Sequence, residues 1–141
     1  MVSSIRVFSE GIDKQQLRIR KIIRLVRNVI LHEGCEVGSV NVIFCDDQYL
    51  GAINKKFLKH NTLTDVITFD YREDFGKTSG DIFISYERVR ENALSFQVKT
   101  DLEVYRVVAH GVLHLLGYDD RTKGDSLVMR QKEEYYLKLV C

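Results

Sequence analysis

The segment His110-Gly-Val-Leu-His114-Leu-Leu-Gly117-Tyr-Asp-Asp120 organises the interpretation of the whole sequence. His110 and His114 are four residues apart, so on a helix their imidazoles lie one turn above each other on one face. Gly117 follows where a helix would end, because glycine adopts the left-handed conformation of a C-terminal cap without steric cost. The reversed chain then returns an aspartate towards both rings. The segment therefore predicts a metal site at a helix end, with two imidazoles and a carboxylate as ligands.

Asp120 is the expected third ligand by spacing, with Asp119 as its nearest competitor and Asp125 as a more distant one. Three protein ligands leave a fourth position for water, and this open position distinguishes a catalytic zinc from a structural zinc. Zinc lowers the pKa of such a water to about 7, which provides hydroxide at neutral pH. We therefore expect one Zn²⁺, although the same donors also suit iron, nickel or manganese. Two buried histidines without a metal are the alternative, which explains the spacing only by coincidence.

The spacing H-x3-H-x2-G-x2-D has the shape of the metzincin zinc motif, in which a third ligand follows a glycine turn. Residue 111 is glycine, whereas zinc proteases carry at this position the glutamate that acts as general base. The sequence therefore predicts a zinc centre and disfavours peptide hydrolysis.

The composition is that of a single globular domain over residues 1–141. Charged residues make up 29% and apolar residues 45% of the chain, which excludes an intrinsically disordered protein. No apolar run is long enough to cross a bilayer and the first residues lack a signal-peptide pattern, so we expect a cytoplasmic protein with no membrane partner. The net charge of +1 gives no general preference for nucleic acid.

Hydrophobic periodicity predicts strands first and helices later, which indicates an α+β fold with about four strands in a mixed sheet covered by helices. The strands are expected at residues 5–8, 40–44, 63–71 and 81–85. The segment 63–71 is rich in β-branched and aromatic residues, so it should be central or nearly central in the sheet.

Each expected helix has a polar residue that marks its start. The starts are Asp13 (a capping box with Gln16), Asp46, Ser85, Thr100 or Asp101, and Asp125-Ser126. The first helix should end near Gly34, and the last should have Leu127, Tyr135 and Leu139 as apolar residues.

Three segments in this order resemble the YbeY family of bacterial rRNA-maturation endoribonucleases. They are Thr64-Asp-Val-Ile-Thr-Phe69, Gly80-Asp-Ile-Phe-Ile-Ser85 and the His110–Asp120 segment, with Met129 and Glu133 downstream. The resemblance implies a single zincin-like α+β domain that binds zinc and cleaves single-stranded RNA. It also implies a role in late small-subunit rRNA maturation and ribosome quality control. The implied partners are the small ribosomal subunit and an assembly GTPase, with no DNA substrate.

Two positions depart from the family pattern. The family motif ends Gly-Tyr-Asp-His, and Asp120 replaces its third histidine; a carboxylate still binds metal, but the identity of that metal is left open. The family commonly carries an arginine before the Thr-Asp-Val motif, where it contacts the scissile RNA, and Leu58 stands at the matching position. The neighbouring Lys59 and His60 are candidates for the missing cation or proton relay, with an ordinary exposed loop pair as the alternative.

Two groups of basic residues are candidates for binding the RNA backbone. The first lies along the expected first helix at spacings i, i+4 and i+7, and the second follows the expected second helix. They are Arg20, Arg24 and Arg27, and Lys55, Lys56 and Lys59. Phosphate binding needs cations along a groove, whereas a solvated helix face explains the same residues without RNA.

These observations leave three hypotheses. The favoured one is a metal-dependent endoribonuclease, in which zinc activates a water and offsets charge on the phosphodiester. A non-catalytic ribosome-assembly factor with a structural metal is the alternative, which Leu58 favours somewhat. Another metallohydrolase is disfavoured by Gly111. A fourth protein ligand on the metal would support the assembly factor, and an exchangeable water would support the enzyme.

Overall fold

The computed structural model describes residues 4–58, 65–71 and 76–140. The strands are β1 (Ser4–Glu10), β2 (Glu36–Cys45), β3 (Val66–Asp70) and β4 (Lys77–Ser85). The helices are α1 (Ile19–His32), α2 (Asp47–Ile53), α3 (Tyr86–Phe96), α4 (Thr100–Leu115) and α5 (Lys123–Val140), with the short turns η1 (Lys14–Gln16) and η2 (Asn54–Leu58). This confirms the predicted α+β class with a four-stranded mixed sheet. No helix in the described part of the chain is both long and apolar enough to span a bilayer.

The sheet has the strand order β1-β2-β4-β3. Strands β1, β2 and β4 run parallel, and β3 pairs antiparallel with β4. The prediction that the segment 63–71 forms a central strand is wrong, because β3 lies at the sheet edge and Ile67 is its one buried residue. β-Branched and aromatic residues suit any pleated, half-buried surface, and the contact of β3 with α4 provides such a surface at the edge.

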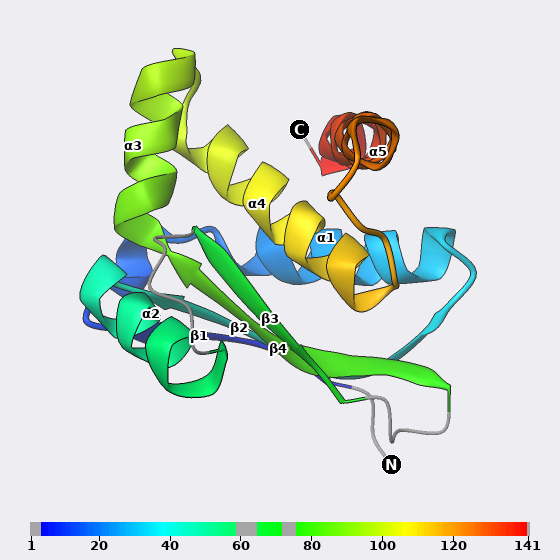
Figure 1. Ribbon diagram of the computed structural model, residues 1–141, viewed down its shortest axis with the longest axis horizontal. Helices are drawn as coiled ribbons and strands as arrows, with labels where there is room; N and C mark the ends of the chain where they lie inside the picture. The colour runs from blue at the N-terminus through cyan, green and yellow to red at the C-terminus, as the bar shows by residue number, and fades with distance from the viewer. Residues whose placement is uncertain (1–3, 59–64, 72–75, 141) are drawn as a thin grey trace.

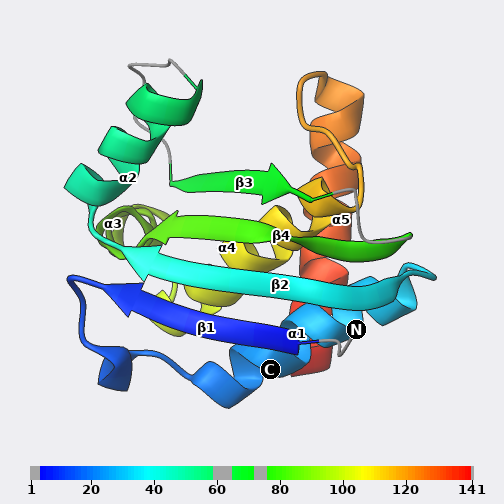
Figure 2. The same ribbon diagram turned by 90° about the horizontal axis from the view of Figure 1, so that it is seen from below.

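Helices α1 and α4 pack on one face of the sheet, and α5 packs on both of these helices as an outer layer (Figure 1). Figure 2 shows the opposite face, where the strands lie in front of these helices and α2 lies at one end of the sheet. The main core forms where apolar side chains of alternate strand residues meet those of α1 and α4. It includes Val7, Val42, Ile82, Leu25, Val29, Val108 and Val112.

Two elements in the first part of the chain start at different residues from those predicted. Asp13 does not open the long helix, because its carboxylate accepts the Gln15 N–H at 2.9 Å and caps η1. The chain then extends and buries Leu17, and α1 begins at Ile19. Strand β4 begins at Lys77 and not at the predicted residue 81, since the segment 77–80 also pairs with β2. In both places tertiary packing outweighs the local sequence signal.

Neither of the last two helices has its predicted residue at the N-cap. Thr100 is already the first residue of α4, and Lys99 at the N-cap makes no side-chain cap bond. Helix α5 begins at Lys123, because the Thr122 hydroxyl accepts the Asp125 N–H at 3.0 Å. The predicted apolar residues of α5, namely Leu127, Tyr135 and Leu139, are 59%, 50% and 45% exposed. The residues that α5 buries are instead Met129, Glu133, Tyr136 and Val140.

Gly80 allows β3 and α4 to approach β4 closely, which gives a test of the fold. A Cβ atom at Gly80 would overlap the carbonyl oxygen of Phe69 and lie 2.9 Å from the Leu115 side chain. We predict that Gly80→Ala lowers the free energy of unfolding by about 1–3 kcal/mol, because backbone must move to relieve the overlap. Gly51→Ala in α2 is the matched control, since its Cβ would meet nothing within 4 Å and alanine favours helix by about 1 kcal/mol. Denaturant titration measures both, and an unchanged stability of Gly80→Ala would contradict the close approach.

Candidate metal centre

Three side chains converge where α4 ends. The Nε2 atoms of His110 and His114 lie 3.0 Å apart. The Oδ2 atom of Asp120 lies 3.4 Å from the first of these nitrogens and 3.5 Å from the second. These three residues form a group that could hold a metal ion, with all three candidate ligand atoms within 4.8 Å of one another. The structure therefore brings together the three metal ligands predicted from the sequence.

The turn after α4 returns Asp120 to the histidines. Gly117 has a φ of +101°, and its N–H donates to the His114 carbonyl at 3.0 Å. The N–H of Tyr118 donates to the Leu113 carbonyl, also at 3.0 Å, which closes the helix end. Glycine at this position adopts the left-handed conformation without a Cβ penalty, so the chain reverses within a few residues.

The Nδ1 atom of each imidazole lies beside a hydrogen-bond acceptor, which places a proton on that nitrogen. The His114 Nδ1 lies 3.0 Å from the Tyr118 carbonyl oxygen, and a carbonyl can only accept. The His110 Nδ1 lies 2.6 Å from the Glu133 carboxylate. Both Nδ1 atoms are therefore placed to donate, which leaves the two Nε2 atoms directed at each other and at the Asp120 carboxylate. A metal cation at this point would accept electron pairs from all three groups.

The spacing of these atoms fits a small tetrahedral cation. Zinc binds imidazole nitrogen and carboxylate oxygen at about 2.0–2.2 Å, which places neighbouring ligands of a tetrahedral site about 3.3–3.5 Å apart. The two separations between nitrogen and the Asp120 oxygen, 3.4 and 3.5 Å, fall in this range, and the 3.0 Å between the two nitrogens is slightly shorter. The donor set and its spacing therefore suit zinc, and two imidazoles with one carboxylate also suit other divalent transition metals.

Glu133 of α5 connects the metal ligands to a buried charge network. Its second carboxylate oxygen accepts from Arg106 at 3.1 Å, and the same guanidinium donates to Glu103 at 2.8 Å. Burial raises the pKa of Glu133, but the hydrogen bond and charge of His110, followed by those of Arg106, outweigh it and lower the pKa overall. Glu133 therefore stays ionised. The carboxylates of Asp120, Glu103 and Glu133 and the guanidinium of Arg106 have a formal net charge of −2. This charge would balance a divalent cation.

A second cluster holds the turn from the opposite side. The Tyr118 hydroxyl donates to the Glu33 carboxylate at 2.5 Å, and Lys132 donates to the same carboxylate at 3.1 and 3.3 Å. The Tyr136 hydroxyl also donates to Glu33, whose side chain is only 10% exposed. The end of α1 and the middle of α5 therefore fix Tyr118, whose carbonyl orients His114.

Comparison with known proteins identifies the family. The family model described as "Endoribonuclease YbeY" matches residues 7–140. The chain belongs to the endoribonuclease YbeY family. Endoribonuclease YbeY of Flavobacterium psychrophilum is 49% identical over 132 residues, which cover 94% of each chain. Endoribonuclease YbeY of Porphyromonas gingivalis is 36% identical over 139 residues, or 99% of this chain and 91% of the relative.

A solved structure supports the same assignment. The solution structure of a Thermotoga maritima protein superposes with a TM-score of 0.66 and 29% sequence identity, over 97% of this chain and 89% of that chain. The predicted family and fold class are therefore confirmed, and the chain belongs to a family named for endoribonuclease activity.

Close packing of α4 on the sheet explains why this YbeY-family chain has a glycine at position 111. A Cβ atom there would lie 2.7 Å from Ile82 Cγ2 and 3.5 Å from Val66 Cγ2. Helix α4 thus packs directly on β4 and β3 at this residue. The position where zinc proteases carry their glutamate is filled by the sheet, so no side chain fits there without displacing it.

The other predicted site residues lie apart from the three ligands. Asp119 accepts the Asp120 N–H at 2.7 Å and pairs with Arg121 at 3.1 Å, so it stabilises the turn. Asp125 is exposed in the first turn of α5. The candidate RNA-binding residues in the described part of the chain are all exposed. They are Arg20, Arg24 and Arg27 on α1, and Lys55 and Lys56 on η2. Helix α1 lies towards the β1 edge and α2 towards the β3 edge (Figure 2). Lys59 and His60 lie outside the described residues.

The sequence analysis missed the residues that hold the ligands in place. The sequence assigns no role to Glu33 or Arg106, and Glu133 enters only as part of the family pattern. Tyr118 is expected only as one of the residues that the glycine turn could return under the two rings. The spacing of Glu103 and Arg106 at i and i+3 predicts a helical ion pair, but nothing in the sequence predicts that the pair is buried beside His110.

Glu133 provides the first test of the site. We predict that Glu133→Gln weakens zinc affinity by about 10- to 100-fold, because the histidine loses its charged hydrogen-bond partner. Glu134→Gln changes the adjacent, exposed carboxylate and should leave the affinity unchanged. Competition with a chromophoric chelator measures both affinities. Equal affinities would show that Glu133 does not support the metal ligand.

Glu33 gives a pH-dependent test in metal-free protein. Burial raises its pKa, but hydrogen bonds from Tyr118, Tyr136 and Lys132 outweigh it, so the folded-state pKa lies below its ordinary value of 4.5. The resulting stabilisation is fully present above pH 4.5 and is lost as the pH falls through the folded-state pKa. The stability advantage of wild type over Glu33→Gln should therefore shrink in acid.

Urea unfolding in chelator from pH 7 to pH 3 would measure this difference. Glu36→Gln, which changes a neighbouring exposed carboxylate at the start of β2, is the control and should show no comparable change with pH. A wild-type advantage over Glu33→Gln that stays constant with pH would contradict the assignment.

Proposed function

We propose that this chain is a metal-dependent endoribonuclease that cleaves single-stranded RNA. The observation that carries the proposal is the convergence of two imidazole lone pairs and a carboxylate within 3.0–3.5 Å of one another. Membership of the endoribonuclease YbeY family supplies the reaction class. We infer zinc as the metal because the donor set and its spacing suit it, with iron, nickel and manganese as the alternatives that elemental analysis would separate.

Each residue of the centre has a distinct role in this proposal. When bound, the metal supplies Lewis acidity, which lowers the pKa of a bound water and offsets charge on the phosphodiester. Glu133 and the Tyr118 carbonyl keep the Nδ1 protons in place, so both Nε2 atoms stay directed at one point. The sheet side of α4 is closed at Gly111, so the substrate phosphodiester approaches from the side on which Asp120 is 41% exposed.

We further propose that the substrate is rRNA of the small subunit during late maturation and quality control in the cytoplasm. This role, with the small ribosomal subunit and an assembly GTPase as partners, follows from the family resemblance. Arg20, Arg24 and Arg27 are exposed on α1, and Lys55 and Lys56 on η2, so all five are accessible to RNA phosphates. Lys59 would extend the second group. We keep Lys59 and His60 as candidates for the cation or proton relay that the family places near Leu58.

A non-catalytic assembly factor with a structural metal remains the competing function. It requires a fourth protein ligand that closes the metal, as structural zinc sites have. Within residues 4–58, 65–71 and 76–140, the candidate ligand group contains three residues and no fourth. This favours an open position and therefore the enzyme. Another metallohydrolase of the protease type is disfavoured, because Gly111 leaves no room for its glutamate.

Metal removal tests the proposed enzyme. We expect purified protein to cut a single-stranded RNA taken from the 3′ precursor of small-subunit rRNA, and chelation to abolish the cut until zinc is restored. His114→Ala should lower the rate on the order of 1,000-fold, because the chemistry depends on the metal. Gel analysis of end-labelled RNA measures the rates.

Asp120→Ala and Asp119→Ala form a matched pair for this experiment. The first removes a ligand and should lose both metal and activity, whereas the second changes a carboxylate that holds only the turn and should retain both. Cleavage that is indifferent to chelation and to His114→Ala would overturn the metal-dependent mechanism.

A further inference from the structure

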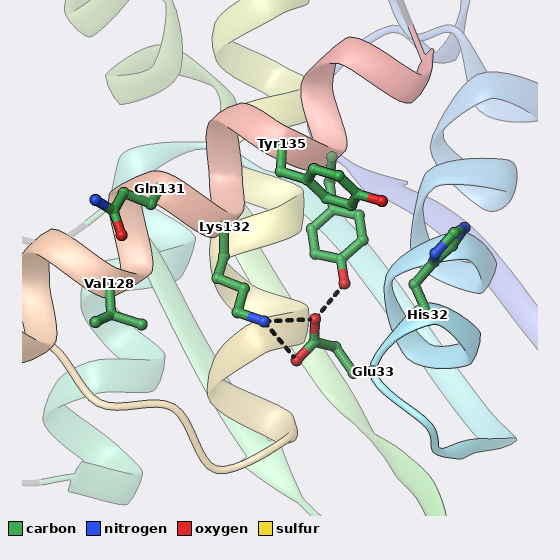
Figure 3. Close-up of a pocket in the computed structure, with 7 residues that line it drawn as sticks. His32, Glu33, Val128, Gln131, Lys132 and Tyr135 are labelled. Atoms are coloured by element: carbon green, nitrogen blue, oxygen red, sulfur yellow. Dashed lines mark hydrogen bonds and ion pairs between the residues drawn. The ribbon is translucent and has the colours of Figure 1, made fainter.

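A cavity of about 390 Å³ lies between the end of α1 and the side of α5 (Figure 3). Its volume falls in the range of pockets that take small ligands. The metal ligands do not line it. Its walls include His32 and Glu33 from α1, and Val128, Gln131, Lys132 and Tyr135 from α5.

The charges in this cavity are already paired. Lys132 donates to both carboxylate oxygens of Glu33, at 3.1 and 3.3 Å, as the dashed lines in Figure 3 show. The hydroxyls of Tyr118 and Tyr136 also donate to this carboxylate. The ammonium is therefore neutralised by a well-bonded partner, and the cavity carries no net charge. Such a site suits an uncharged, polar ligand better than a phosphate.

The aromatic side chains leave ring surface uncovered. Tyr135 is 50% exposed, although its ring meets the buried Tyr136 ring edge-on at a centroid distance of 5.0 Å. His32, which is exposed, lies 6.3 Å from Tyr135 at an interplanar angle of 75°. Edge contacts hold the Tyr135 ring while sparing much of its surface for stacking. The Gln131 amide adds a hydrogen-bond donor and acceptor, and Val128, which is 43% exposed, adds apolar surface.

We propose that this cavity binds one unpaired nucleobase of the RNA strand that the metal centre cuts. Unpaired bases stack on tyrosine and histidine rings and are read by amide hydrogen bonds, which are the groups present here. Because the ligand is taken to be RNA, this inference rests on the proposed function.

The cavity is connected to the metal centre through Tyr118. The Tyr118 hydroxyl bonds to Glu33 in the cavity wall, and its carbonyl bonds to His114 at the metal site. Tyr118 therefore contacts both the wall of the cavity and a residue of the candidate metal centre. A base held in the cavity would not contact His110, His114 or Asp120, which do not line it. It would therefore contribute to substrate binding and not to the chemical step.

Binding to metal-free protein tests this proposal without cleavage. Fluorescence anisotropy in chelator would follow a labelled single-stranded oligoribonucleotide. Tyr135→Ala should weaken its binding by about 5- to 150-fold, which is the usual effect of losing one stacked base. Tyr135→Phe keeps the ring and should bind normally. Tyr49→Ala removes a tyrosine on α2 that is 41% exposed and should also bind normally.

A strand of the same length with abasic sugars separates base recognition from charge. Tyr135→Ala should not affect its binding, and an equal loss on both strands would overturn the proposal. His32→Ala, which removes the neighbouring ring at an exposed position, is a second variant that should weaken binding only of the strand with bases. Unchanged binding by Tyr135→Ala and His32→Ala overturns the proposal as well.

The outcomes separate this inference from the proposed function. If Tyr135→Ala binds RNA normally while His114→Ala abolishes cleavage, the base site is wrong and the nuclease stands. If Tyr135→Ala weakens binding of the base-containing strand alone while cleavage ignores chelation, the base site stands and the metal mechanism is wrong.

Discussion

The structure depends on one electrostatic constraint at the end of α4, where two imidazole lone pairs and a carboxylate oxygen face one another within 3.0–3.5 Å. Glu133 and the Tyr118 carbonyl accept from the two Nδ1 atoms, so both Nε2 atoms are directed at one point beside Asp120. A bound cation would offset the repulsion between these groups. The surrounding helices are arranged to keep the three groups together.

Helix α1 from the first part of the chain meets the consecutive helices α4 and α5 around this constraint. Helix α4 carries the histidines, α5 supplies Glu133 to one ring, and the end of α1 supplies Glu33 to the turn that holds the other. Because each contact joins a different pair of elements, a bound metal would stabilise the packing of α1, α4 and α5 together. Metal affinity and folding stability would therefore be coupled in the proposed centre.

The sequence predicts best what depends on short spacing. Two histidines on one helical face, a glycine turn and an aspartate are brought together as predicted and form the candidate ligand group. Asp46 and Ser85 cap α2 and α3 as expected. It fails where distant segments decide, as in the edge position of β3. The network around Glu33 was not predicted for the same reason, because its partners are 85 to 103 residues away along the chain.

In the proposed centre, Asp120 would change the balance between holding the metal and activating a water bound to it. A carboxylate in place of a neutral histidine adds one negative charge to the ligand set, which strengthens attraction for the cation but makes a bound water less acidic. The buried glutamates Glu103 and Glu133 share only one arginine, Arg106, so they add a further negative charge behind His110. In the proposed mechanism, such a centre would hold its cation strongly and would depend more on charge compensation at the phosphodiester than on a very acidic water.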